Sequence, residues 1–265
     1  MSKGIALITG ASTGIGAVYA DRLAKQGYDL ILVARDAVKL QQHAARITGE
    51  TGRKVETVAA DLANKSDLAR VEEILRSNQQ ITILVNNAGL GAASKLIDSP
   101  VDEMEHMITL NVTALTRLTQ AALPGFTERK QGTLINIASI VAVAPDLLNG
   151  VYGGTKAFVL ALTQSLSNEL KDKGIRVQAV LPGATRTEIW ARSGKDVDSF
   201  PTDWVMEAGD LVDAALLGFD RGETVTIPPL ADEGEWKAFE AARHAMDGKL
   251  SNRVVAARYR EAVAA

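Results

Sequence analysis

The chain has 265 residues, of which 46% are hydrophobic and 23% are charged, a balance that suits one large α/β domain or two small ones. A formal net charge of −3 without any basic block argues against a nucleic-acid-binding surface. The absence of cysteine excludes disulfides, thiolate catalysis and cysteine metal sites. A strand is expected within the first few residues and no apolar run reaches membrane-spanning length, so we expect a cytoplasmic protein without a signal peptide.

The first predicted strand, Gly4–Thr9, leads directly into a glycine-rich turn. Its short apolar run is typical of a strand that is buried on both faces of a parallel sheet. The turn, Gly10–Gly16, spaces its glycines as G-x-x-x-G-x-G, and a helical pattern follows to about Gln26. Backbone N–H groups at such a helix start attract anions, so the turn indicates a pyrophosphate site. The alternative is a tight turn that binds nothing.

The second predicted strand, Asp29–Val33, ends in Ala34-Arg35-Asp36. In dinucleotide-binding folds an acidic residue at this strand end accepts the ribose hydroxyl of NAD, whereas an arginine suits the 2′-phosphate of NADP. No carboxylate occupies the strand tip itself, so Arg35 favours NADP(H) over NAD(H). The alternative is that Arg35 is an exposed residue at a helix start, paired with Asp36.

Strands and helices then alternate along the rest of the chain. This alternation predicts a doubly wound α/β sheet of about seven mostly parallel strands, with helices on both faces and a single domain over residues 1–265. The further predicted strands are Val55–Ala59, Ile81–Val85, Thr133–Ala138, Ile175–Leu181 and, more weakly, Thr224–Ile227; the further predicted helices are 65–77, 101–123 and 152–172.

Three polar features stand at or between these elements. Asn86 and Asn87 follow a buried strand, and because a buried unpaired amide is costly, we expect both to bond to backbone, to a cofactor or to both. Ser139 comes just past a strand end, at the edge where parallel sheets bind ligands. Asn111 lies within the predicted helix 101–123, and the pattern does not decide which way it faces.

Tyr152 and Lys156 lie four residues apart at the start of a predicted helix, and so share one helix face. A nearby ammonium favours phenolate, so we expect the pKa of Tyr152 to fall below its ordinary value of about 10. Such a tyrosine would serve as a general acid or base. The alternative is a surface Tyr and Lys at a helix start.

Taken together, these motifs resemble the short-chain dehydrogenase/reductase family in its compact one-domain form. The resemblance covers about residues 4–190 and implies a Rossmann-like fold that interconverts a carbonyl and an alcohol by hydride transfer with NADP(H). The matching segments are Thr9-Gly10-x-x-x-Gly14-Ile15-Gly16, Asp61, Asn86-Asn87-Ala88-Gly89, Asn111, Ser139, Tyr152-x-x-x-Lys156 and Pro182-Gly183.

The resemblance also implies a role for each catalytic residue. Tyr152 would exchange a proton with the substrate oxygen, which Ser139 would hold by a hydrogen bond. Lys156 would bond the nicotinamide ribose and lower the tyrosine pKa, and Asn111 would hold a water that links Lys156 to solvent. Cofactor contacts are implied at Gly10, Ser12, Thr13, Gly14, Ile15, Gly16, Arg35, Asp61, Leu62, Asn87, Ala88, Gly89, Tyr152, Lys156, Pro182, Gly183 and Thr187.

Two later segments are harder to interpret. Residues 188–209 mix Trp190, Phe200 and Trp204 with glycine and proline, which suggests an apolar lid over an apolar carbonyl substrate or, alternatively, a surface cluster packed on the last helices. We expect residues 232–265 to form a helical extension. The sequence leaves open whether this extension braces a subunit contact, closes the pocket or is simply solvated. The apolar stripe from Phe158 to Leu170 suggests a homodimer or homotetramer, unless it only covers the sheet.

Two other functions remain as alternatives. A 3-oxoacyl thioester reductase would need a channel for a long carrier arm, and a basic docking patch would favour it, but the sequence shows none. A nucleotide-sensing protein without chemistry would use the same fold. The three histidines, His43, His106 and His244, fit no metal spacing, so we expect no metal site.

Overall fold

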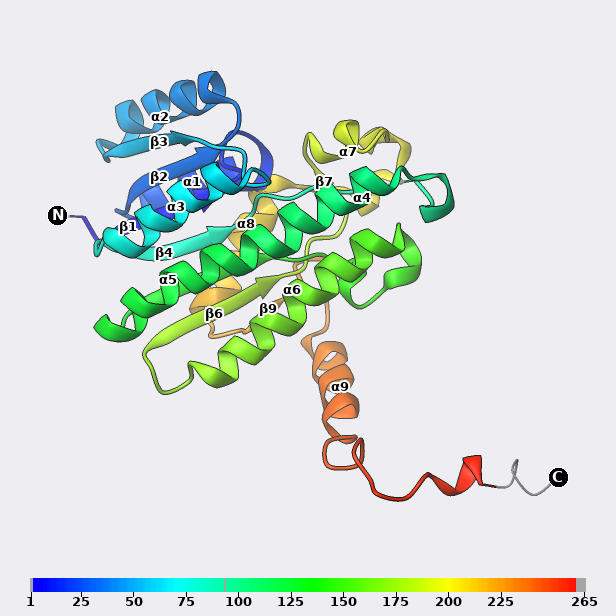
Figure 1. Cartoon of the computed structure of the whole chain (residues 1–265). Coiled ribbons are helices and arrows are strands. Elements are labelled where there is room, and N and C mark those ends of the chain that lie inside the picture. The colour runs from blue at the N-terminus through cyan, green and yellow to red at the C-terminus, as the bar shows by residue number, and fades with distance from the viewer. Residues whose placement is uncertain (1, 93, 261–265) are drawn as a thin grey trace. The chain divides into compact units, whose positions relative to one another are not determined.

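A seven-stranded sheet organises the chain in the computed structural model, which describes residues 2–92 and 94–260. All adjacent strands pair in parallel, in the order β3-β2-β1-β4-β5-β6-β9 (Figure 1). The predicted doubly wound parallel sheet is therefore confirmed. The strands are β1 Ile5–Thr9, β2 Asp29–Ala34, β3 Val55–Ala59, β4 Ile81–Asn86, β5 Gly132–Ile137, β6 Ile175–Val180 and β9 Val225–Thr226.

The chain winds outward from the middle of this sheet in both directions. From β1 it runs through β2 to β3, and then crosses over to β4 and continues through β5 and β6 to β9. The strand order therefore reverses between β1 and β4, and a crevice opens there beyond the carboxyl ends of the strands. The glycine turn follows β1, and Asn87 follows β4, so both lie at this crevice.

Helices cover both faces of the sheet, as predicted. Ala6 and Ile8 of β1 pack under α1, α2 and α8, whereas Leu7 points to the opposite face under α3, α5 and α6. This division follows from the alternation of side chains along a strand. The structure contains two helices, α2 and α8, that the sequence analysis did not predict. The helices are α1 Gly14–Lys25, α2 Ala37–Thr51, α3 Lys65–Ser77, α4 Val101–Ile108, α5 Leu115–Arg129, α6 Gly150–Glu169, α7 Ile189–Arg192 and α8 Ala208–Asp220.

The predicted helix over 101–123 is interrupted. A π-helical segment, Thr109–Ala114, separates α4 from α5, and α5 continues to Arg129. π-Helical turns are rare and frequently occur at functional sites. Periodicity cannot reveal such a turn, because one wide turn barely alters the spacing of apolar residues.

A second, two-stranded sheet encloses the predicted lid. Its parallel strands are β7, Thr185–Arg186, and β8, Met206–Glu207, and they pair Thr185 with Met206. Between them lie α7 and two 3-10 turns, Val197–Ser199 and Thr202–Trp204. The lid is therefore a loop whose two ends are held together.

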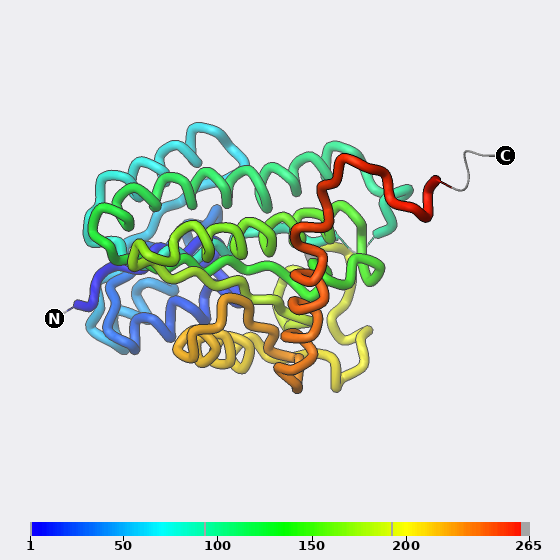
Figure 2. Tube along the Cα trace, turned by 90° about the horizontal axis from the view of Figure 1, so that it is seen from below, coloured from blue at the N-terminus to red at the C-terminus, as the bar shows by residue number. Residues whose placement is uncertain are grey.

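Residues Leu230–Ala265 form a compact unit separate from Met1–Pro229. It contains α9, Glu233–His244 (Figure 2, orange). The side chain of Asp232 caps the first turn of this helix. After α9, the part that the structure describes, up to residue 260, contains one 3-10 turn, Ala257–Tyr259. The α-helix thus covers only part of the range 232–265 that was expected to be helical.

Candidate active site

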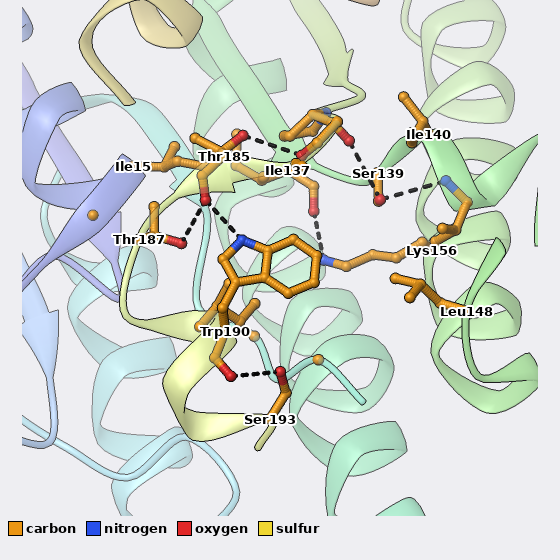
Figure 3. Close-up of a pocket in the computed structure, with 18 of the residues that line it drawn as sticks. Ile15, Ile137, Ser139, Ile140, Leu148, Lys156, Thr185, Thr187, Trp190 and Ser193 are labelled. Carbon is orange, nitrogen blue, oxygen red and sulfur yellow. Dashed lines mark hydrogen bonds between the residues drawn. The ribbon is translucent and has the colours of Figure 1, made fainter. Parts of the chain in front are cut away.

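A cavity of about 510 Å³ lies at the carboxyl edge of the sheet (Figure 3). Its walls come from the glycine turn, the ends of β4, β5 and β6, helix α6 and the predicted lid. Most of the predicted site residues therefore meet in one place although they are far apart in sequence. Those that line the cavity are Gly10, Thr13, Gly14, Ile15, Asn87, Ala88, Gly89, Ser139, Tyr152, Lys156, Pro182, Gly183 and Thr187.

Tyr152 and Ser139 meet at the wall of this cavity. Helix α6 begins at Gly150, where the Asn149 side chain accepts a hydrogen bond from the backbone N of Val151 at 2.9 Å. Tyr152 therefore sits in the first turn, with 8% of its surface exposed, and the Ser139 hydroxyl is near enough to its phenol to lower the phenol pKa. The Ser139 hydroxyl also lies 3.4 Å from the Pro182 carbonyl, to which it can donate. Two hydroxyl groups thus converge where a substrate oxygen would need donors.

The ammonium of Lys156 is buried and directed at the end of β5. Its Nζ donates to the carbonyl oxygen of Ile137 at 2.9 Å (Figure 3). The same Nζ lies 5.8 Å from the centroid of the Tyr152 ring. Burial lowers the pKa of Lys156 to about 8. The predicted shared face of Tyr152 and Lys156 is confirmed, and desolvation makes the lysine easier to deprotonate.

The expected fall in the tyrosine pKa is wrong for this structure. Burial raises the pKa of Tyr152, because desolvation disfavours the phenolate, and the influence of the Ser139 hydroxyl offsets this only in part. The sequence argument considered the charge of Lys156 and left out desolvation. Tyr152 is therefore protonated at neutral pH, which suits a proton donor.

Asn111 lies in the π-helical segment and is buried, with 2% of its surface exposed. Its Oδ1 accepts from the backbone N of Leu90 at 2.8 Å, and its Nδ2 donates to the Leu90 carbonyl at 2.9 Å and to the Thr155 hydroxyl at 3.1 Å. A Cβ on Gly89 would lie 3.1 Å from Asn111 Oδ1 and 3.6 Å from Lys156 Nζ. Asn111 thus ties the loop after β4 to α6 beside Lys156, and its role in a water relay stays a prediction.

The glycine turn leaves no room for side chains. Gly10 and Gly14 have φ of +66° and +59°, a conformation that favours glycine. A Cβ on Gly16 would lie 2.4 Å from the carbonyl oxygen of Gly10, and one on Gly10 would lie 2.7 Å from Asn87 Nδ2. Thr13, the residue before α1, makes no side-chain capping bond, and the first turn of α1 carries no acidic residue. This cradle fits a dinucleotide pyrophosphate, whose charge suits a helix N-terminus.

The two adjacent asparagines have different partners. Asn87 Nδ2 donates to the carbonyl oxygens of Thr9 at 2.9 Å and Gly10 at 3.2 Å, so the predicted backbone partner of Asn87 is confirmed. Asn86 faces the core, where its Nδ2 donates to the side chains of Thr119 at 3.1 Å and Asn136 at 2.9 Å. The expected backbone or cofactor partner of Asn86 is therefore wrong, because alternation along β4 turns it away from the crevice.

At the end of β2, Arg35 is exposed. No residue in the described part of the chain forms an ion pair or hydrogen bond with its side chain. Asp36 instead caps α2, accepting from the backbone N of Lys39 at 3.0 Å. The alternative in which Arg35 pairs with Asp36 is therefore not what the structure shows. Lys39, which the sequence analysis missed, forms an ion pair with Glu188 at 3.1 Å.

Ser12, Gly16, Arg35, Asp61, Leu62 and Asn111 do not line the cavity itself. Asp61 follows β3, where its Oδ1 accepts from the backbone N of Ala63 at 3.0 Å, and Leu62 is buried. Gly16 lies behind Gly10 and Asn111 lies behind Gly89, two glycines that do line the cavity. The adenosine contacts predicted at Asp61 and Leu62 stay predictions.

Three aromatic residues of the lid line the cavity: Trp190, Phe200 and Trp204. The Trp190 and Phe200 rings meet edge to face with centroids 4.8 Å apart, and Trp190 Nε1 donates to the Thr185 carbonyl at 2.8 Å (Figure 3). Lys195 Nζ lies 4.1 Å from the Phe200 centroid. Trp204 is 66% exposed. Of the two alternatives for this segment, these contacts favour a lid over the cavity rather than a surface cluster packed on the last helices.

The family model for short chain dehydrogenases matches residues 4–198 of this chain. The chain belongs to the short-chain dehydrogenase/reductase family. It is thus an oxidoreductase that acts on alcohol and carbonyl groups with a nicotinamide cofactor. No helix of the described residues is long and apolar enough to cross a membrane, and they include no group of three or more His, Asp or Glu that could hold a metal ion.

Two solved structures are similar to this chain over nearly its whole length. A short-chain dehydrogenase from Sphingobium yanoikuyae in complex with NADPH is 50% identical, with a TM-score of 0.94 over 97% of this chain and 100% of that one. A bulky-bulky ketone specific alcohol dehydrogenase from Comamonas testosteroni is 43% identical, with a TM-score of 0.90 over 98% of this chain and 100% of that one. An uncharacterised oxidoreductase of Staphylococcus epidermidis is 34% identical over 84% of this chain and 94% of its own length.

Proposed function

We propose that this chain is an NADP(H)-dependent oxidoreductase that interconverts a bulky, apolar ketone or aldehyde and the corresponding alcohol, with Tyr152 as general acid/base. The observation that carries the proposal is the meeting of the Tyr152 phenol and the Ser139 hydroxyl at the wall of a cavity that aromatic side chains cover. The cofactor would supply the hydride when bound.

The two hydroxyl groups would act together on the substrate oxygen. Ser139 would donate a hydrogen bond to it, and Tyr152 would first donate a hydrogen bond and then its proton as the oxygen gains negative charge. Burial keeps Tyr152 protonated before the reaction, because it raises the pKa of the phenol. The Lys156 ammonium would stabilise the phenolate that the transfer leaves behind, since opposite charges attract strongly in a buried site. Alcohol oxidation would reverse these steps.

Two observations support NADP(H) over NAD(H). The side chain of Arg35 is exposed at the end of β2 and carries no partner among the described residues, so it is available to a 2′-phosphate. The Sphingobium yanoikuyae protein, at 50% identity, is in complex with NADPH. Gly10, Gly14 and Gly16 would hold the pyrophosphate, and Pro182, Gly183 and Thr187 would line the nicotinamide end.

The lining of the cavity supports a bulky apolar substrate. Trp190, Phe200 and Trp204 of the proposed lid, residues 188–209, face it together with aliphatic side chains from the loop after β5. The Comamonas testosteroni relative carries the description bulky-bulky ketone specific, which agrees with this choice. The charged residues of the lid that line the cavity are one lysine, Lys195, and two carboxylates, Glu188 and Asp203. This mixture does not favour a 3-oxoacyl thioester reductase, which would need a basic patch.

A cytoplasmic location, one catalytic domain over the whole chain and a homodimer or homotetramer belong to the same proposal. Oligomerisation rests on the family rather than on the apolar stripe of α6. Leu166 and Leu170 of that stripe are buried in the core on one face of the sheet, so they already cover it, whereas Phe158 is 39% exposed.

The test is NADPH oxidation against a panel of bulky ketones, small ketones, aldehydes and 3-oxoacyl thioesters, with Tyr152→Phe beside the wild type. We expect turnover of bulky ketones that falls about 10²- to 10⁴-fold in Tyr152→Phe, the usual contribution of general acid–base catalysis. NADPH binding should be retained. Unchanged turnover in the variant would contradict the role of Tyr152, and tight NADPH binding without turnover of any member would favour the nucleotide-sensing alternative.

A further inference from the structure

An ion pair joins two segments of the unit Met1–Pro229 that lie 149 residues apart in sequence. Lys39 Nζ lies 3.1 Å from Glu188 Oε1, and each side chain is 45% exposed. Lys39 belongs to the first turn of α2, directly after the corner that contains Arg35 and Asp36. Glu188 immediately precedes α7, at the start of the proposed lid.

One partner of the pair borders the cavity, and the other follows the corner at Arg35 in α2. Glu188 lines the cavity, as do its neighbour Thr187 and Gly14 of the glycine turn. A Cβ on Gly14 would lie 3.1 Å from Thr187 Cγ2, so the residue just before the proposed lid lies against the turn that would hold the pyrophosphate. Figure 3 shows Thr187 beside Ile15 of that turn. The ion pair of Glu188 with Lys39 therefore connects the segment beside the glycine turn to the corner that contains Arg35.

The three charged side chains at this corner, Arg35, Asp36 and Lys39, differ in their polar partners. The Arg35 side chain makes no polar contact with the described residues, and the Asp36 carboxylate caps α2. Lys39 follows Arg35 by four residues, but its ammonium is held by Glu188. A phosphate monoester at Arg35 would bring a charge of about −1.5 to −2 and several acceptor oxygens, against −1 for the carboxylate. The lysine stem is long and flexible enough to change partners.

We propose that Lys39 is a second reader of the 2′-phosphate, and that it leaves Glu188 for the phosphate when NADPH binds. This inference rests on the proposed NADP(H) dependence. Glu188 then opposes NADPH binding by competing for Lys39, and cofactor binding frees the first residue of the lid from α2. NADH presents a hydroxyl at the same position and leaves the ion pair in place.

The test compares the dissociation constants of NADPH and NADH, followed by the fluorescence of the reduced nicotinamide. The proteins are the wild type, Glu188→Gln, Lys39→Met and the double variant, at an ionic strength of about 50 mM so that screening is weak. An exposed ion pair changes an equilibrium by up to about fivefold. We expect Glu188→Gln to tighten NADPH two- to fivefold and Lys39→Met to weaken it at least as much, with NADH unchanged in both.

The double variant separates an exchange of partners from simple repulsion between Glu188 and the phosphate. If Lys39 exchanges partners, Glu188→Gln has no effect once Lys39 is methionine, so the two changes are not additive. Equal effects of Glu188→Gln in both backgrounds, or equal effects on NADPH and NADH, would overturn the proposal. A wild type that binds NADPH no more tightly than NADH would instead overturn the proposed cofactor.

The chain offers a matched control in the ion pair of Lys54 and Glu56, 2.6 Å apart and with side chains 74% and 48% exposed. Neither residue lines the cavity. Glu56→Gln removes the same charge by the same isosteric change, and should leave both dissociation constants unchanged. A shift in NADPH binding of the same size in Glu56→Gln would attribute the effect to net charge and overturn the role of Glu188.

Discussion

The proposed cofactor cradle and the proposed lid face each other across one cavity and are built differently. The cradle is held by partly buried hydrogen bonds from side chain to backbone, such as those of Asn87 Nδ2 with the carbonyl oxygens of Thr9 and Gly10, and has no space for a Cβ at Gly16. The lid is held by exposed ion pairs, such as Arg186 with Asp198 at 2.7 Å, and by contacts between aromatic rings. Changes in the cradle should therefore affect folding and all substrates, and changes in the lid should affect the choice of substrate.

The largest expected effect is that of Gly16→Ala. The added Cβ would lie 2.4 Å from the Gly10 carbonyl oxygen, and backbone must move to make room. We expect a loss of about 1–3 kcal/mol in the free energy of unfolding, typical of overpacking, together with loss of cofactor binding. Urea unfolding and NADPH titration measure the two effects.

Gly49→Ala is the control for that experiment. A Cβ on Gly49, in helix α2, would meet nothing within 4 Å. Alanine should therefore raise the free energy of unfolding by about 0.5–1 kcal/mol, through helix propensity alone, and leave NADPH binding unchanged. If Gly16→Ala changes the free energy of unfolding and NADPH binding no more than Gly49→Ala does, the cradle is not rigid. The proposed difference between the cradle and the lid would then be wrong.

Lys156→Met should have an intermediate effect on stability that depends on pH. Burial lowers the pKa of Lys156 from 10.5 to about 8, so the folded protein releases a proton that the unfolded chain keeps up to pH 10.5. The cost of burying the ammonium is full below pH 8, at about 3 kcal/mol, and shrinks as the pH rises from 8 toward 10.5. The variant avoids this cost but leaves the Ile137 carbonyl without the Lys156 donor.

We therefore expect the wild type to gain stability relative to Lys156→Met between pH 7 and pH 9.5, although the variant loses its turnover. Urea unfolding of both proteins at the two pH values measures this difference. Both values lie below the ordinary pKa of tyrosine, so the comparison reports the lysine. A constant difference in the free energy of unfolding would show that Lys156 does not titrate in this range.

The smallest effect on stability, and a selective effect on catalysis, is expected of Trp204→Ala. Trp204 lines the cavity but is 66% exposed, so its loss should change the free energy of unfolding by less than about 0.5 kcal/mol. Loss of apolar contact should lower kcat/KM for bulky ketones about 10-fold or more and spare small ketones. Steady-state kinetics with bulky and small ketones measure this difference. An equal loss of kcat/KM for both would show that Trp204 does not select between substrates.

The sequence was most informative where structure depends on neighbouring residues. β3 and α3 have the predicted bounds, and the glycine turn and the shared face of Tyr152 and Lys156 appear as expected. Each of these follows from local periodicity, from a conformation that favours glycine or from helix geometry. The resemblance to a known family then assembled the separate motifs into one site.

The sequence was least informative where a side chain depends on distant segments. Nothing in the spacing around Asn86 shows that its amide bonds Thr119 and Asn136, or that Asn111 lies in a π-helical turn against Leu90. The ion pair of Lys39 with Glu188 joins residues that no local pattern connects. Such partners are chosen by the packing of one element on another.

The sequence by itself determined the alternation of strands and most of the helices and the glycine turn, and it predicted the reactive residues, because these are encoded by near neighbours along the chain. Only the tertiary structure decided the electrostatic state of the site. Burial raises the pKa of Tyr152 and lowers that of Lys156, the reverse of a simple attraction between phenolate and ammonium. The reason is that desolvation depends on everything packed around a group, and that packing exists only once the distant segments have come together.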